Sequence, residues 1–325
     1  MSRARPDTKT TSPLRSGSST GAGDRVFRGL SRGAGIALLG IMAAIAAFLL
    51  IRGLSAIQGD SANFLTEQRW APKDDPPTFG IAAIAFGTVL SSLIAMALAV
   101  PVAVGVALFI SHYAPRRIAI PLGYVIDLLA AVPSVVYGLW GIRFLVPRLE
   151  PLHQWLGAHL GFIPLFEKSA AGSRTMLTAG VVLAIMILPI IAAVSREVFL
   201  QVPRDHEEAA LALGATRWEM IRAAVLPFGR PGVISAAMLG LGRALGETVA
   251  VAMVLSPRNV ISLHILNPEG NTIAANIANS FGEADDFARD ALIASGLVLF
   301  VITLIVNASA RLIVARRREF AGAAI

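Results

Sequence analysis

Residues 201–229 read QVPRDHEEAALALGATRWEMIRAAVLPFG and connect two apolar stretches, 176–195 and 233–255. Asp205 is placed to N-cap a first short helix, and Gly214 is placed to end that helix in a left-handed conformation. The sequence therefore predicts a helix closed at both ends, and not an open loop, between the two apolar stretches.

The residues that follow predict a second helix. Thr216-Arg-Trp-Glu219 has the spacing of a capping box, in which each side chain bonds to the backbone N–H of the other residue. We expect this helix to stop at Pro227, because proline disfavours a helical conformation in the residue before it. We interpret the two helices as a docking element for a cytoplasmic partner; a pair of helices lying in the lipid headgroups is the alternative.

The composition is that of an integral membrane protein. The chain has 325 residues, 55% of them hydrophobic and only 15% charged, with a mean hydropathy of +0.68, whereas soluble domains are about 25% charged. The net charge of +7 does not indicate nucleic-acid binding. We interpret it as the excess of Lys and Arg that cytoplasmic segments of membrane proteins carry. The sequence contains no cysteine, which excludes disulfides, thiolate metal sites and cysteine nucleophiles.

Six stretches are apolar enough to cross the bilayer, so we expect an all-α membrane fold of about six transmembrane helices. These stretches are 33–51, 79–111, 118–146, 176–195, 233–255 and 291–310. The second is longer than a hydrocarbon core of about 30 Å requires, so we expect a tilted helix bent near Pro101.

Positively charged residues predict the orientation. With the N-terminus inside, the cytoplasmic segments hold 18 Lys and Arg residues and the outer loops hold 8. Because cytoplasmic loops are enriched in these residues, both termini are expected in the cytoplasm. The expected segments are a disordered cytoplasmic tail (1–30), a first transmembrane helix (33–51), an extracytoplasmic loop (52–78), a membrane core (79–313) and a basic cytoplasmic tail (314–325).

The loop carries a resemblance to a known family. Its pattern is similar to the EAA loop of ABC importer permeases, and the matching residues are Glu208, Ala209, Ala210, Gly214, Leu226 and Pro227. The resemblance implies a coupling helix that sits in a groove of an ATPase subunit. Ala224 departs from the pattern, which favours Ile at this place and predicts one weaker packing contact.

Further stretches resemble phosphate importer permeases. They are PLGYVIDLLAAVPSVVYGLWG (121–141), LTAGVVLAIMILPIIAAVSREVF (177–199), GLGRALGETVAVAMVL (240–255) and NTIAANIANSFGEA (271–284). The run at 132–141 resembles the PstC-type subunit more than its PstA-type partner. The resemblance implies a type I ABC importer permease in the cytoplasmic membrane, which would work with a PstA-type permease, two ATPase subunits that hold ATP and Mg, and an extracytoplasmic phosphate-binding protein.

Charged residues deep inside predicted spans mark the candidate pathway. They are Arg243, Glu247 and Asp127. An ionised group near the bilayer midplane costs about 2.5 kcal/mol or more, so a partner or a water-filled cavity is expected. The spacing of four places Arg243 and Glu247 on one helix face, close enough to pair.

We interpret Arg243 as the cation that replaces part of the hydration of a phosphate during transport, because a planar guanidinium suits oxyanions. Glu247 would hold Arg243 in place when no anion is bound. The alternative is a structural pair that joins two helices. Asp127 also has a structural alternative, a contact with a donor on a neighbouring helix.

Other chemistries find no support in the sequence. None of the three lysines, Lys9, Lys73 and Lys168, follows a glycine, so a P-loop is excluded and the chain is not expected to be an enzyme. The histidines lack metal-binding spacing. Three alternatives stay open: a gradient-driven secondary anion transporter, a permease for another oxyanion such as sulfate or molybdate, and a membrane component that signals phosphate status.

Overall fold

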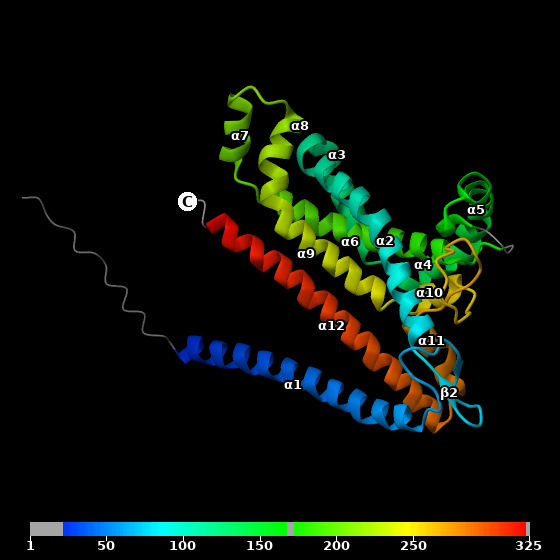
Figure 1. Cartoon of the computed structure of the whole chain (residues 1–325). Coiled ribbons are helices and arrows are strands. Elements are labelled where there is room, and N and C mark those ends of the chain that lie inside the picture. Colours follow the sequence, from blue (N-terminus) through cyan, green and yellow to red (C-terminus); the bar gives the residue numbers. More distant parts are fainter. Residues whose placement is uncertain (1–21, 168–171, 323–325) are drawn as a thin grey trace, which may run out of the picture. The chain divides into compact units, whose positions relative to one another are not determined.

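The computed structural model describes residues 22–167 and 172–322 (Figure 1). The chain divides into two compact units, Met1–Phe48 and Leu49–Ile325. In the first unit, residues 1–21 of the predicted tail lie outside the described residues, and helix α1 (Ala22–Gly59) already begins at Ala22. The structure thus differs from the expected disorder for residues 22–30, because extending a helix from a long apolar stretch costs far less than starting one.

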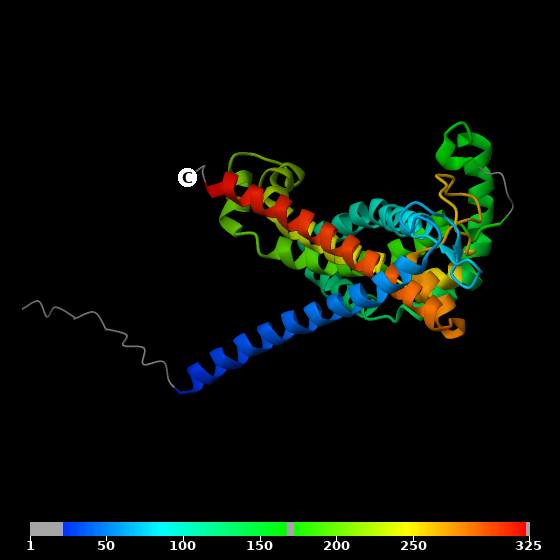
Figure 2. The same cartoon turned by 60° about the horizontal axis from the view of Figure 1, so that its bottom comes forward.

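Four long helices form the centre of the second unit: α2 (Ala82–Leu108), α6 (Met176–Leu200), α9 (Leu226–Leu245) and α12 (Asp286–Gly322). α2 packs along α6, α6 packs along α9, and α12 lies beside α9 (Figure 1 and Figure 2). On α2, Ala95, Ala99, Ala103 and Ala107 recur every fourth residue and are fully buried. Small side chains on one face allow neighbouring helices to approach closely.

Five helices are long and apolar enough to cross a membrane among the described residues: Gly23–Gly59, Ala82–Tyr113, Met176–Leu200, Arg217–Leu245 and Asp286–Leu312. The second of these passes through Pro101 without interruption and ends in a π-helical turn, η1 (Phe109–Tyr113). The first, second, fourth and sixth predicted stretches each correspond to one such helix.

The third predicted stretch is not one helix. It is divided into α3 (Arg116–Ala130), α4 (Ser134–Trp140), a π-helical turn η2 (Gly141–Leu145) and α5 (Val146–Leu160). The chain bends by 91° between the first of these and the rest. Pro133 stands at the bend with an extended ψ of 140°, because proline interrupts the helical hydrogen bonds. The two parts together have the length and apolarity of one bent span.

The fifth predicted stretch also breaks. Helix α9 ends at Leu245, and a short helix α10 (Val249–Val254) follows after three residues. Arg174 holds the end of α10, because its Nη2 donates to the carbonyl oxygens of Met253 and Leu255 at 3.1 and 2.7 Å. This broken region carries both Arg243 and Glu247.

The end of the unit that carries residues 60–81 has a small core of its own. Two short antiparallel strands, β1 (Trp70–Ala71) and β2 (Thr78–Phe79), pair with Trp70 opposite Phe79. The fully buried Phe79 ring makes edge-to-face contacts with three rings, those of Phe64, Trp70 and Phe287. The remaining elements on this side are η3 (Pro164–Phe166), α11 (Ile273–Ser280) and η5 (Phe281–Glu283). The predicted loop 52–78 is thus packed and ordered.

Candidate functional site

The first helix of the loop, α7 (Arg204–Ala212), begins two residues earlier than predicted. Pro203 occupies the N-cap position with an extended backbone, and no side chain caps the helix. The expected capping role of Asp205 is therefore wrong. Asp205 lies in the first turn instead, where a carboxylate interacts favourably with the positive end of the helix dipole.

The turn after α7 has the predicted left-handed glycine. Gly214 has φ of +84°. The Gly214 N–H donates to the carbonyl of Leu211 at 2.9 Å, and the Ala215 N–H donates to that of Ala210 at 3.2 Å. This pair of bonds is a Schellman motif, which satisfies the last carbonyls of the helix. The prediction for Gly214 is confirmed.

The predicted capping box is present at the start of α8 (Arg217–Met220). The Thr216 N–H donates to Oε2 of Glu219 at 2.8 Å, and the Glu219 N–H donates to Oγ1 of Thr216 at 3.3 Å. Two backbone N–H groups at this helix start, which have no partner within the helix, are thereby hydrogen-bonded.

Pro227 does not end this helix, contrary to the prediction. α8 continues through a π-helical turn, η4 (Ile221–Val225), into α9, so that Arg217–Leu245 is one span. The Leu226 N–H donates to the carbonyl of Ile221 in the wider π pattern, and Pro227 falls in the first turn of α9, where it is tolerated. We call residues 204–225 the coupling element, after the role that the resemblance implies. This element is continuous with the helix that carries Arg243.

One side of the coupling element is fixed to the membrane helices. Buried residues of this element and of the ends of α2 and α6 form a small core together. The members of this core are Ala107, Leu108, Phe199, Val202, Met220, Ile221 and Val225. Ala210 packs against this core. Nε2 of His112 lies 3.3 Å from Oε1 of Glu207 and adds a polar contact between η1 and α7.

The other side of the coupling element is open. Leu213 is 90% exposed and Trp218 is 55% exposed, and Glu208, Ala209 and Gly214 are also exposed. The exposed Leu213 and Trp218 side chains leave apolar surface at this capped turn that is available to a partner.

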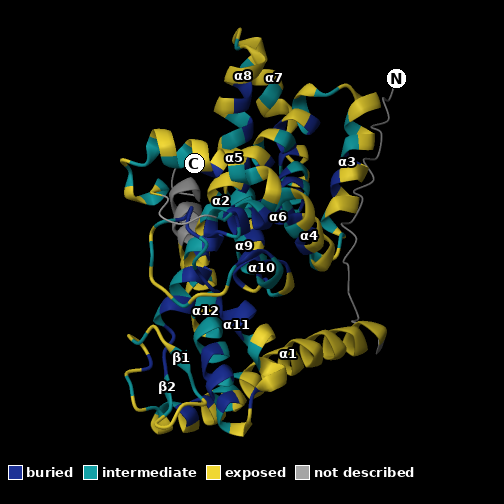
Figure 3. Ribbon diagram, turned by 90° about the vertical axis from the view of Figure 1, so that its right-hand side faces the viewer, coloured by how far each residue is buried: buried dark blue, intermediate teal, exposed yellow. Residues whose placement is uncertain are grey.

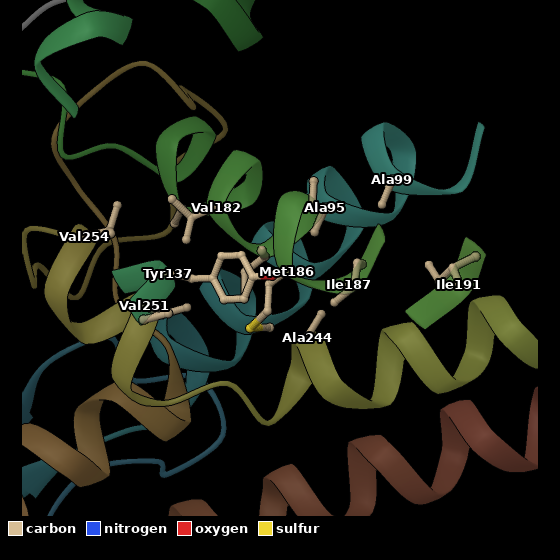
Figure 4. Packing of buried hydrophobic residues seen from close by; sticks show 14 of the residues in the cluster. Ala95, Ala99, Tyr137, Val182, Met186, Ile187, Ile191, Ala244, Val251 and Val254 are labelled. Carbon is tan, nitrogen blue, oxygen red and sulfur yellow. The ribbon is translucent and has the colours of Figure 1, made fainter. Parts of the chain in front are cut away.

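Arg243 lies in the last turn of α9 and is half-buried. No hydrogen bond or ion pair of its guanidinium is present among the described residues. The next residue, Ala244, packs into the central core close to Met186, and Tyr137 points into the same core (Figure 4). Arg243 is thus an uncommitted cation at the edge of the apolar core.

Glu247 lies in the break between α9 and α10 and is only 9% exposed. Its Oε1 accepts a hydrogen bond from the N–H of Ala250 at 3.1 Å. The described residues contain no ion pair between Arg243 and Glu247, so the pairing expected from their spacing is wrong. The physical reason is that the helix ends at Leu245, which removes the geometry that brings residues four apart together.

Asp127 has a partner on a neighbouring helix. Its Oδ2 lies 3.5 Å from Nη2 of Arg196 on α6. This contact is of the structural kind that the sequence left open, and a pathway role for Asp127 stays a prediction. Within the described residues, no group of three His, Cys, Asp or Glu side chains could hold a metal ion.

Sequence reasoning did not single out Arg196 or Arg174, which hold α3 to α6 and close the end of α10. Both lie at the ends of apolar stretches, where arginine is common, so only their contacts distinguish them. Their signal in the sequence would have been a cation next to an apolar run without a counter-charge at helical spacing.

The sequence is similar to known transport proteins. Residues 87–319 match the family described as binding-protein-dependent transport system inner membrane component. Phosphate transport system permease protein PstC 2 of Mycobacterium tuberculosis is 48% identical over 296 residues, which cover 90% of this chain and 91% of that one. PstC of Mycobacterium leprae is 46% identical over 82% of this chain and 86% of that one. PstC of Pasteurella multocida is 38% identical over 90% of this chain and 91% of that one.

Solved structures have the same fold. A chain of the inward-facing MetNI methionine ABC transporter matches with a TM-score of 0.53 at 14% identity, covering 73% of this chain and 95% of that one. A chain of a bacterial ABC transporter involved in the import of the acidic polysaccharide alginate has a TM-score of 0.53 at 17% identity, covering 88% and 98%. At these identities the likeness concerns the fold alone.

Proposed function

The chain belongs to the family of binding-protein-dependent transport system inner membrane components, and from this premise we propose that it is the permease subunit through which an ATP-driven importer moves inorganic phosphate. It is a multi-pass membrane protein with an ABC importer permease fold, as the sequence predicted. The predicted resemblance to PstC-type permeases is likewise confirmed by its relatives. We place it in the cytoplasmic membrane.

One observation carries the proposed mechanism. A single span, Arg217–Leu245, begins at the capped turn of the coupling element and ends with Arg243 in its last turn. A displacement imposed on the turn is therefore transmitted along one continuous helix to the half-buried cation. Residues 246–248, which are not helical, are the place where α9 and α10 can change their relative angle.

Arg243 supplies the charge that the transported anion needs. A phosphate entering a region of low dielectric loses hydration, and a guanidinium replaces part of it with paired hydrogen bonds. Because Arg243 is not committed to Glu247, it is available to an anion without first breaking a salt bridge. A pathway must also release its ion, which a single half-buried cation permits more readily than a closed cage.

The remaining parts of the importer are partners. We propose that two ATPase subunits hold ATP and Mg, that one of them receives the exposed tip around Leu213, and that a second, homologous PstA-type permease completes the pathway. An extracytoplasmic phosphate-binding protein would deliver the substrate. This chain holds no cofactor in the proposal, and hydrolysis takes place on the ATPase.

The proposal is tested by uptake of labelled phosphate into proteoliposomes that contain the assembled complex and the binding protein. Uptake that requires ATP on the side of the coupling element supports the proposal. Uptake driven by a proton or sodium gradient without ATP would point to the secondary transporter. Competition with sulfate and molybdate separates phosphate from other oxyanions, and a regulatory phenotype in a transport-dead variant would reveal a signalling role.

A further inference from the structure

A cavity lies between the ends of α3 and α6 and the start of α7. Its volume is about 450 Å³, and three of its lining residues are arginines from the three different helices, Arg116, Arg196 and Arg204. The cavity is at the same end of the molecule as the coupling element, the end that the charge distribution places in the cytoplasm. Nothing in the transport mechanism above uses it.

Arg196 provides a positive charge in a fixed position at the base of this cavity. Only 14% of its side chain is exposed, and its Nη2 lies 3.5 Å from Asp127 and 2.8 Å from Glu197. Its guanidinium rests against α3 where Gly123 leaves room, since a Cβ at Gly123 would overlap Nη1 of Arg196. Two carboxylates and one glycine thus hold this side chain in a single position.

The other two arginines are uncommitted. Arg116 and Arg204 are exposed, and neither makes an ion pair or a hydrogen bond through its side chain within the described part of the chain. Three guanidinium groups face two carboxylates in the cavity, which leaves an excess positive charge. Guanidinium groups of this kind bind the oxygens of a phosphate group.

A ridge of apolar residues rises from the same cavity. Ile120, Tyr124 and Leu128 are 58%, 67% and 70% exposed and follow one another every fourth residue on α3. Ile120 and Tyr124 also line the cavity. Most of α3 is not buried (Figure 3), and of its residues only Gly123 and Ile126 are buried.

The ridge decides which phosphate compound fits. Eight residues of helix span roughly 12 Å, close to the thickness of one leaflet of the hydrocarbon core at about 15 Å. A free phosphate ion would leave this ridge without a ligand, whereas the acyl chain of a phospholipid can lie along it. Basic pockets between membrane helices on the cytoplasmic side bind anionic headgroups.

We propose that this cavity binds the headgroup phosphate of an anionic phospholipid of the inner leaflet, with its acyl chain along α3. Arg116 and Arg204 contact the headgroup, and Arg196 provides the fixed charge beneath them. The inference does not rest on the proposed function, because lipid retention is measured without transport.

The test uses the full-length chain in its complex, reconstituted in nanodiscs of phosphatidylcholine with a graded fraction of phosphatidylglycerol. After transfer to mild detergent, native mass spectrometry counts the retained phosphatidylglycerol. The double variant Arg116→Gln/Arg204→Gln should bind it about 30-fold more weakly, since each arginine near an anionic headgroup contributes about a factor of five. Arg117→Gln is the matched control, because Arg117 is exposed on the same turn but does not line the cavity.

Two further arms separate the lipid from free phosphate. Leu128→Asn should reduce phosphatidylglycerol retention while the arginines stay in place, and millimolar inorganic phosphate should not displace the lipid. Gly123→Ala, which moves Arg196 from its position, should also weaken retention. Equal retention by the double variant and the Arg117→Gln control overturns the proposal, as does displacement of the lipid by inorganic phosphate or equal retention of phosphatidylcholine.

Discussion

The carboxylate of Glu247 accepts a hydrogen bond from the backbone N–H of Ala250, 3.1 Å away, and so closes the first turn of α10. Ala250 is fully buried and lies against α4, where the Cα of Gly138 leaves room for it. The acidic side chain therefore has a structural task that does not depend on Arg243. Its charge and its hydrogen-bonding role can be separated by substitution.

Glu247→Gln should leave the complex stable, because the amide oxygen can still accept the hydrogen bond from Ala250. Glu247→Ala should lower the free energy of unfolding by about 0.5–2 kcal/mol, the usual cost of losing a side chain that caps a helix. The measurement is the thermal unfolding of the purified complex for both variants. Equal loss of stability in both would show that the charge, and not the cap, is what this position needs.

Gly214→Val should uncouple the complex without preventing insertion of the permease. A β-branched residue at φ of +84° is strained by about 1–3 kcal/mol, so the turn between α7 and α8 should open. Copurification of the ATPase and phosphate uptake should fall together. Gly214→Asn is the control, because asparagine tolerates the left-handed conformation, and it should retain most of both activities.

Leu213→Asn should weaken ATPase binding with little effect on the permease itself, because this side chain is 90% exposed and contributes little to the fold. Burial of a leucine in a partner contributes about 1.5–3 kcal/mol, so the affinity should fall roughly ten- to a hundredfold. Leu65→Asn, in the loop between α1 and β1 and 67% exposed, should leave the affinity unchanged. Undiminished ATPase binding by the first variant would remove Leu213 from the interface.

The sequence predicted the local features of the loop better than its limits. Gly214 and the Thr216–Glu219 capping box follow from short-range rules of backbone conformation and hydrogen bonding, and both are present. The end at Pro227 was mispredicted, because a proline is tolerated when the turn before it widens to a π-helix. That adjustment depends on the packing of Ile221 and Val225 and has no signature of its own in the sequence.

The breaks inside apolar stretches were also beyond reach of hydropathy. The average hydropathy of residues 233–255 predicts one span, although α9 ends before Gly246 and α10 starts at Val249. The same holds for the 91° bend at Pro133, which an average over 118–146 does not show. Such breaks are stabilised by distant groups, such as Arg174 at the end of α10, which a linear reading does not connect.

The orientation with both termini inside can be tested with single cysteines, since the chain contains none. Thr66→Cys lies at an exposed position of the outer loop, and Ala212→Cys lies at an exposed position near the coupling turn. An impermeant thiol reagent added to intact cells should label the first and label the second only after the cells are opened. Labelling of position 212 in intact cells would reverse the orientation.

Substitutions of Arg243 separate a role in the transport pathway from a role in holding helices together. Arg243→Ala should lower phosphate uptake at least roughly tenfold, the effect of losing hydrogen bonds to a charged group, while the complex still assembles. Arg243→Lys should retain part of the uptake, because it keeps the charge but loses the paired geometry.

The double variant Arg243→Ala/Glu247→Ala distinguishes a pathway role of Arg243 from mutual neutralisation of the two charges. The two side chains form no ion pair in the structure, so we expect the pathway role. If their task were to neutralise each other, removal of both would restore uptake. For a pathway cation, uptake should stay low in the double variant even after the cap at Ala250 is restored by Arg243→Ala/Glu247→Gln. Uptake normalised to the amount of assembled complex distinguishes the two, and near-normal transport by either double variant would exclude Arg243 from the pathway.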